Sequence, residues 1–134
     1  MILRRQVLLK AIVTEKLKEE LRREVTDAIA QVEEGQQQLD SQSRRVMLEL
    51  QRSDLNRAMA FRQQLEAEKR KQDDLKTELR ERLQEYEALE IGSEFVRGLL
   101  EGSVEIREGD NLTDKMSKAE IIVKDDIVVT IREA

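Results

Sequence analysis

The fold is decided by the stretch at residues 46–61, VMLELQRSDLNRAMAF, where two helical patterns meet out of phase. Apolar residues recur at heptad spacing on both sides of it, first Val25, Val32, Leu39 and Val46, then Ala58, Leu65, Leu79 and Tyr86. Val25 and Ala58 are 33 positions apart, which is four heptads plus five, and no single insertion of three or four residues bridges that offset. The pattern therefore predicts that one helix ends and a second begins between Leu50 and Ala58, with the N-cap supplied by residues 51–54.

The two helices are expected to form a long antiparallel coiled-coil hairpin over residues 14–90, reversing near residues 51–57. The chain has no proline to interrupt them, Thr14 is suited to cap the first helix, and Gly92 is suited to end the second. Seven apolar residues are predicted to hold the hairpin together: Leu21, Val32, Leu39, Val46, Phe61, Leu75 and Leu79. Other layers pair an apolar residue with a polar one, so we expect another copy or another protein to cover part of the seam.

The segments outside the helices have the pattern of strands. Residues rich in β-branched side chains occur at 6–13, 104–107, 121–123 and 127–131. Asp125 and Asp126 form a two-residue turn between the last two segments. The sequence thus predicts an α+β fold in three parts: the N-terminal strand of a small β-module at 1–13, the helical hairpin at 14–90, and the C-terminal strands of the β-module at 91–134. Closure of the β-module into a barrel, and a domain-swapped dimer of straight helices, stay open alternatives.

The composition excludes several classes of function. Of 134 residues, 40% are charged, three are aromatic and none is Cys or His, which removes disulfides, thiolate nucleophiles, imidazole bases and nearly every zinc site. The Ser, Thr, Lys and carboxylate side chains show no nucleophile–base arrangement, and no stretch approaches the roughly 18 apolar residues of a membrane span. We therefore expect a cytoplasmic protein that is not an enzyme, with no catalytic residues, cofactor, metal site, small-molecule substrate or membrane contact. The small β-module favours a homo-oligomer.

Four segments carry a family resemblance: Val7–Glu15, Gly92–Glu94, Val104–Asp110 and Ile121–Val128. Their order and spacing resemble the bacterial YlqD family, and the helical middle matches in character. The resemblance implies no catalytic or binding residues. Genes of this uncharacterised family often lie beside genes for ribosomal proteins and RNA-maturation factors. Its members usually carry glycine after the Lys–Asp of the last turn, where this chain has Asp126.

Charge divides unevenly along the predicted hairpin. Residues 44–72 contain eight basic and four acidic residues, whereas residues 14–43 contain four and eight, and residues 73–90 contain three and seven. Folding near residue 53 therefore produces an acidic stem and a basic tip. The basic residues of the tip are Arg44, Arg45, Arg52, Arg57, Arg62, Lys69, Arg70 and Lys71.

This basic tip has two interpretations. In the first it is a solvated surface with ion pairs between residues four apart, such as Glu66 with Arg70. In the second it neutralises phosphates, although the tip has only Phe61 as an aromatic for base stacking. We expect a non-catalytic interaction or scaffold protein that presents the hairpin from an oligomerising β-module to an unknown protein partner, with the basic tip as the contact. The alternative is a ribosome-associated or RNA-binding factor.

Overall fold

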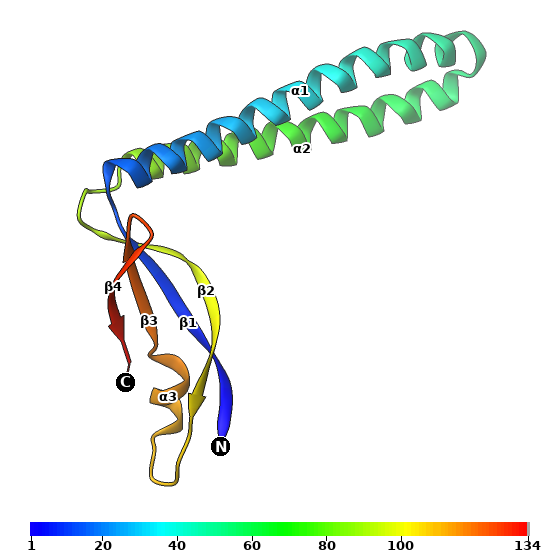
Figure 1. The fold of residues 1–134 in the computed structure, drawn as a ribbon. Coiled ribbons are helices and arrows are strands. Elements are labelled where there is room, and N and C mark those ends of the chain that lie inside the picture. Colours follow the sequence, from blue (N-terminus) through cyan, green and yellow to red (C-terminus); the bar gives the residue numbers. More distant parts are fainter. Residues whose placement is uncertain (134) are drawn as a thin grey trace. The chain divides into compact units, whose positions relative to one another are not determined.

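The chain folds into two compact units with an α+β composition, as the sequence predicts. A computed structural model describes residues 1–133. One unit combines residues 1–19 with the C-terminal part from Leu89, and contains a sheet; we call it the β-module. The other unit, Glu20–Ala88, is a pair of long helices (Figure 1).

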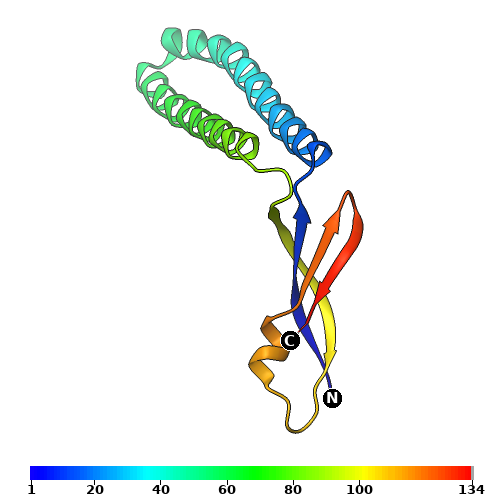
Figure 2. The same ribbon diagram turned by 90° about the vertical axis from the view of Figure 1, so that its left-hand side faces the viewer.

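The helical unit is the predicted antiparallel hairpin. Helix α1 spans Glu15–Ser53 and helix α2 spans Leu55–Glu87, so Asp54 alone separates them. Asp54 leaves the helical conformation with φ −157° and ψ 99°, and its side chain accepts a hydrogen bond from the Arg57 N–H at 3.2 Å. This N-cap satisfies a backbone donor of α2 and fixes the point of reversal (Figure 2).

The seam between the helices differs from the predicted heptads toward the tip. Leu21, Val25, Ala58 and Leu79 are buried as expected for core positions. Val46 and Leu75, also predicted to hold the seam, are instead 41% and 44% exposed. The prediction for these two was wrong. The inward positions nearby are taken by the buried Ser43 and by the half-buried residues Met47, Gln72 and Lys76.

The sheet of the β-module has four strands in the order β2-β1-β3-β4. The strands are β1 Ile2–Ile12, β2 Glu94–Glu105, β3 Glu120–Lys124 and β4 Ile127–Arg132. Strand β1 pairs antiparallel with β2 and parallel with β3, and β3 pairs antiparallel with β4. The N-terminal strand therefore joins the C-terminal strands within one chain. Strands β2 and β4 are the two edges, so the sheet is open rather than a closed barrel.

The pairing of β1 with β2 starts next to the ends of the two long helices. The Val13 N–H donates to the Ser93 carbonyl at 2.8 Å, and the Gly92 N–H donates to the Val13 carbonyl at 2.8 Å. Strands β1 and β2 are longer than predicted, because their charged ends continue the backbone ladder beyond the β-branched runs. Between β2 and β3 the short helix α3, Leu112–Ser117, is capped by Asn111, whose side chain accepts from the Asp114 N–H at 3.1 Å.

One face of the sheet is covered by a network of ion pairs. Arg132 on β4 contacts Glu94 on β2 at 3.0 Å and Glu120 on β3 at 3.3 Å, although β2 and β4 are opposite edges. Lys10 on β1 contacts Glu120 at 3.0 Å. Lys10 and Ile122 are register partners, so Ile122 lies on the same face, where it is only 2% exposed. The network thus spans a curled sheet over a buried isoleucine.

Acid is expected to weaken this network. The hydrogen bond from Lys10 lowers the pKa of Glu120 below its usual 4.5, and the hydrogen bond from Arg132 lowers the pKa of Glu94 in the same way. A carboxylate whose pKa is lower in the folded state adds stability above about pH 4.5, and that stability is lost as the pH falls through the folded value. The melting temperature of the β-module should therefore fall between pH 5 and pH 3, measured by circular dichroism. Glu120→Gln should flatten this dependence, whereas the exposed Glu101→Gln should leave it unchanged.

The turn between β3 and β4 requires two residues in the left-handed region. Asp125 has φ 48° and Asp126 has φ 70°, the signs of a type I′ hairpin turn. Asp125 is fixed by a second interaction, because the Thr14 hydroxyl donates to its carboxylate at 2.7 Å. Asp126 makes no side-chain hydrogen bond among the described residues. Its conformation is therefore held by the turn alone.

Replacing Asp126 with glycine should stabilise the β-module by about 0.5 to 1 kcal/mol, because glycine adopts positive φ without steric cost. Thermal unfolding monitored by circular dichroism would measure the gain. Asp125→Gly is the matched control, since it gains the same conformational freedom but loses the bond to Thr14. If Asp126→Gly destabilises the protein as much as Asp125→Gly, the turn geometry described here is incorrect.

Candidate interaction surface on the helical hairpin

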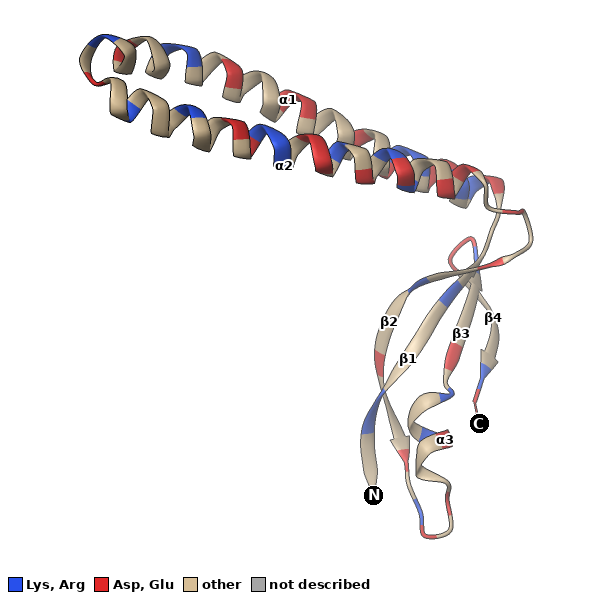
Figure 3. Cartoon of the chain, turned by 180° about the vertical axis from the view of Figure 1, so that it is seen from behind, with Lys and Arg blue, Asp and Glu red and all other residues tan. Residues whose placement is uncertain are grey.

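The eight basic residues of the tip gather at one end of the hairpin. Arg44, Arg45 and Arg52 lie on α1, and Arg57, Arg62, Lys69, Arg70 and Lys71 lie on α2. The pairing of Asp40 with Lys69 at 2.9 Å sets the register, and residues 44–72, which contain all eight, form the distal half (Figure 3). Seven of the eight side chains are exposed, and Lys69 is half-buried. The distal half is thus a basic surface, as the charge pattern indicates.

Most of these charges are not neutralised within the chain. Lys69 pairs with Asp40, whose pKa it lowers by a hydrogen bond and by its charge, and Arg57 lies 3.8 Å from Asp54. In residues 1–133 the remaining six have no ion pair within 4.0 Å: Arg44, Arg45, Arg52, Arg62, Arg70 and Lys71. The predicted pair between Glu66 and Arg70 does not form. Six cations are therefore available to an anionic partner.

One side of the hairpin carries a ladder of polar contacts between the helices. Its four rungs are Arg22–Glu87 at 3.6 Å, Glu33–Arg80 at 3.9 Å, Gln36–Asp73 at 2.8 Å and Asp40–Lys69 at 2.9 Å. All four contacts lie on one side of the seam, because their positions along each helix are 3, 4, 7 or 11 residues apart, which is close to whole turns. The ladder covers the stem but ends at Asp40 and Lys69.

Toward the tip, beyond Asp40 and Lys69, both helices carry exposed apolar residues. Arg44 and Leu48 follow Asp40 at steps of four along α1, while Arg62, Met59 and Leu55 precede Lys69 at steps of seven, three and four along α2. On each helix these residues are neighbours three or four positions apart, and we call the five of them the distal patch. Leu48 is 57% exposed, Leu55 70% and Met59 66%. The distal patch therefore combines three exposed apolar side chains with two unpaired arginines.

Sequence reasoning found the arginines of the distal patch but missed its apolar residues. Leu48, Leu55 and Met59 belong to neither heptad stripe. An apolar residue outside a stripe is expected to be exposed, and this was the one sequence signal that could have identified them. An isolated exposed apolar residue needs no explanation, but three near the same hairpin tip make a candidate contact surface. The arrangement suits a partner segment with an apolar stripe and acidic flanks.

The described residues offer little for other kinds of chemistry. No group of three or more His, Cys, Asp or Glu residues among them is arranged to hold a metal ion. Within the same residues no helix is long and apolar enough to cross a bilayer.

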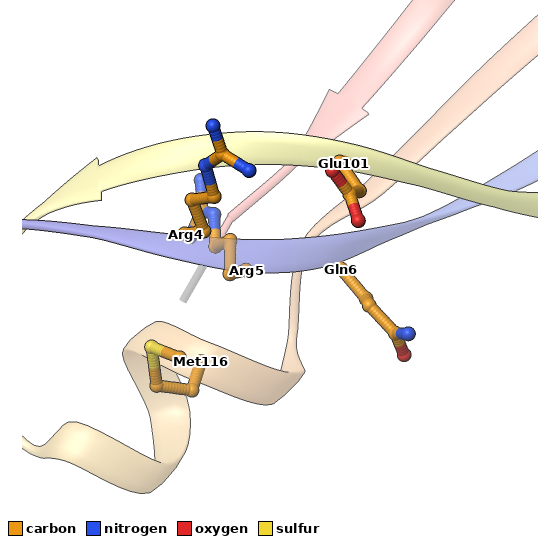
Figure 4. A pocket seen from close by; sticks show the side chains of 5 residues that line it. All are labelled: Arg4, Arg5, Gln6, Glu101 and Met116. Carbon is orange, nitrogen blue, oxygen red and sulfur yellow. The ribbon is translucent and has the colours of Figure 1, made fainter.

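A shallow pocket of about 360 Å³ lies beside α3 and is lined by Arg4, Arg5, Gln6, Glu101 and Met116. Figure 4 shows that these side chains point in different directions and do not converge on one point. The Arg5 guanidinium already donates to the Lys115 carbonyl at 2.9 Å and pairs with Glu133. Arg5 thus ties β1 to α3 and to the C-terminal segment, which is a structural role.

The sequence and the fold both match known proteins along nearly their whole length. A family model described as YlqD protein matches residues 1–132. The chain belongs to the YlqD family. The structure is similar to the crystal structure of a protein of unknown function from Synechococcus sp. WH 8102, with a TM-score of 0.82 and 27% sequence identity over 99% of this chain and 95% of that chain. Among curated proteins no match is found.

Proposed function

We propose that this YlqD family member is a non-catalytic interaction protein of the cytoplasm whose distal patch binds an acidic, amphipathic helical segment of a protein partner. The observation that carries the proposal is the exposure of Leu48, Leu55 and Met59 beside Arg44 and Arg62. An apolar stripe on the partner would cover the three apolar side chains. Acidic residues flanking that stripe would pair with the arginines and steer the encounter.

The proposal includes self-association through the β-module. Of the large apolar side chains exposed in residues 1–133, eleven of sixteen belong to the β-module. A unit of this size has difficulty burying a sufficient core alone, and a second copy is a common remedy. An oligomer would present two or more hairpins, which raises the avidity for a partner with repeated segments.

The test is binding of a synthetic helical peptide with leucine at positions i, i+3, i+4 and i+7 and glutamate on both flanks. Leu55→Ala with Met59→Ala should weaken binding at least tenfold in fluorescence anisotropy, because both apolar contacts are lost. Val46→Ala with Leu75→Ala is the matched control, since these residues are also exposed and apolar but lie outside the distal patch. Equal affinity for the two double variants would refute the proposed site.

A second candidate function is binding of RNA or the ribosome. Six exposed basic side chains that form no ion pair with another described residue favour it, because each can neutralise a phosphate. Arg44, Arg45, Arg70 and Lys71 would be the principal contacts together with Arg52 and Arg62. The absence of an exposed aromatic side chain in the described distal half makes recognition of a protein the better supported of the two.

Sedimentation of a native lysate distinguishes the two candidates. In the RNA-binding case the chain should co-migrate with ribosomal particles at low salt and leave them at high salt. Replacing Arg44, Arg45, Arg70 and Lys71 together by glutamine should abolish co-migration without changing the oligomeric state. The matched control replaces four exposed basic residues elsewhere, Lys16, Arg23, Arg82 and Lys124. RNA association that survives the distal variant would exclude the second candidate.

A further inference from the structure

Strand β4 is an unprotected edge of the sheet. It is the last strand in the order β2-β1-β3-β4, so one of its backbone edges has no partner in the described chain. All six of its residues are exposed. Ile127 is 68% exposed, Val128 54%, Val129 51% and Ile131 66%. Both faces and the free edge of this strand are therefore available for pairing.

The side chains of β4 lack most devices that keep sheet edges apart. Natural edge strands are protected by charged residues, proline, short length or bulges. Residues 127–131, IVVTI, have no charge and no proline. The devices present are a shift in register that leaves Val129 without a partner on β3 and the charge of Arg132 at the end of the strand. The other edge, β2, is different, because it carries Glu94, Arg97, Glu101 and Glu105.

Eleven large apolar side chains are exposed in the described part of the β-module, and four of them lie along the single strand β4. Helix α3, with six residues, is the only described helix wholly within the unit that packs against the sheet.

We propose that β4 pairs antiparallel with β4 of a second copy of this chain, joining two four-stranded sheets into one sheet across a two-fold axis. The uncharged segment 127–131 requires a partner strand without charge, and the same segment of a second copy supplies one. Every residue in it is β-branched, so antiparallel pairing places β-branched side chains opposite each other. Arg132 does not oppose the contact, because it is already held by Glu94 and Glu120.

Cysteine crosslinking tests this arrangement directly, because the chain contains no cysteine. Val129 and Thr130 lie at the middle of β4, and the middle of a strand that pairs antiparallel with its own copy lies next to itself. Val129→Cys and Thr130→Cys should each be tested under mild oxidation, and at least one should give a disulfide-linked dimer in most of the protein. Glu101→Cys, on the exposed surface of the other edge strand, is the matched control and should stay largely monomeric on a denaturing gel.

A charge placed on β4 provides an independent measurement. Val129→Lys should weaken the dimer at least tenfold in multi-angle light scattering or analytical ultracentrifugation, since the two-fold axis brings two lysines together. Val129 has no partner on β3, so this change spares the β3–β4 pairing, and circular dichroism would verify the fold. Leu99→Lys, at a residue of β2 with 59% exposure, is the control and should leave the dimer unchanged.

This inference rests on the self-association included in the proposed function, and its outcomes are separate from those of the proposed partner binding. A monomeric wild-type chain at micromolar concentration would overturn the pairing of β4. So would a dimer in which neither cysteine on β4 crosslinks more than Glu101→Cys, or one that tolerates Val129→Lys and dissociates with Leu99→Lys. Binding of the acidic peptide to the distal patch is measured on the same variants. Its loss or survival bears on the proposed function alone.

Discussion

Replacing Leu21 with alanine is expected to lower the free energy of unfolding of the helical hairpin by about 3 kcal/mol, within the range of 2 to 5 kcal/mol found for buried leucines. Leu21 is only 2% exposed, and its truncation removes buried apolar contacts and leaves a cavity. The change should appear as an earlier loss of the helical circular dichroism signal in a denaturant titration. It should be the largest single effect among the leucines of the hairpin.

The comparison with Leu75→Ala makes this prediction specific. A strict heptad places Leu21 and Leu75 alike in the seam, whereas in the structure Leu75 is 44% exposed. We therefore expect Leu75→Ala to cost less than about 1 kcal/mol. Equal losses from the two substitutions would favour the heptad seam over the observed packing. A small loss from Leu21→Ala would contradict the burial of that residue.

The departure from the heptads has a geometric cause. A straight α-helix has 3.6 residues per turn, so a residue repeated every seven positions drifts by about 20° per heptad. Val25 is buried, and Val46, three heptads later, is rotated off the seam by about 60° and is 41% exposed. Ser43 and Met47 occupy the inward positions in its place. The sequence could therefore predict the reversal and the antiparallel pairing, but not which residues face inward near the tip.

Polar residues in and beside the seam explain why the sequence pattern misleads there. Asp40 and Lys69 pair across the helices, and Gln36 donates to Asp73 at 2.8 Å. Among residues 1–133, the side-chain oxygen of Gln72 is buried without a hydrogen-bond partner. These polar residues do not contribute to an apolar repeat. A search for apolar periodicity therefore assigns the neighbouring Leu75 to the seam. The middle of the hairpin is consequently less well packed than its base.

The sequence was enough to predict the basic residues of the candidate site, but not its exposed apolar residues. Eight basic residues between positions 44 and 72 are visible in the sequence, and the reversal at Asp54 is enough to bring them together. The ends of the polar ladder at Asp40 and Lys69 depend on the register of the two helices, which the sequence does not specify to one residue. Leu48 and Met59 therefore become part of a surface only once the structure places both helices.

In the sheet, too, features set by neighbouring residues could be predicted from the sequence, whereas contacts between distant strands could not. The turn at Asp125 and Asp126 and the pairing of the N-terminal strand with the C-terminal strands follow from local pattern and the helical reversal. The ion pair of Arg132 with Glu94 does not, because it joins opposite edges of a curled sheet. Curvature is set by bulges and twist, such as the register shift between Leu9 and Lys10, rather than by composition.

Replacing Ile122 with alanine is expected to destabilise the β-module by about 3 kcal/mol, because this side chain is 2% exposed and fills the curled face under the ion pairs. The module buries few large side chains, so it has little packing to compensate for the cavity. A loss of this size is a large part of the stability of a small domain and should raise amide exchange in β1 and β3. Hydrogen exchange followed by mass spectrometry would resolve it from the hairpin.

The control for this prediction is Ile2→Ala, since Ile2 is an isoleucine on the same sheet but 74% exposed. It should cost less than about 0.5 kcal/mol, the usual limit for surface substitutions. Ile122→Val should cost about 1 kcal/mol, because it removes one methylene group while keeping the β-branched shape. Arg132→Gln opens the network without creating a cavity, so it should raise exchange in β4 more than in β1. If Ile122→Ala and Arg132→Gln gave the same pattern of exchange, the ion pairs rather than the buried isoleucine would hold the sheet in its curled form.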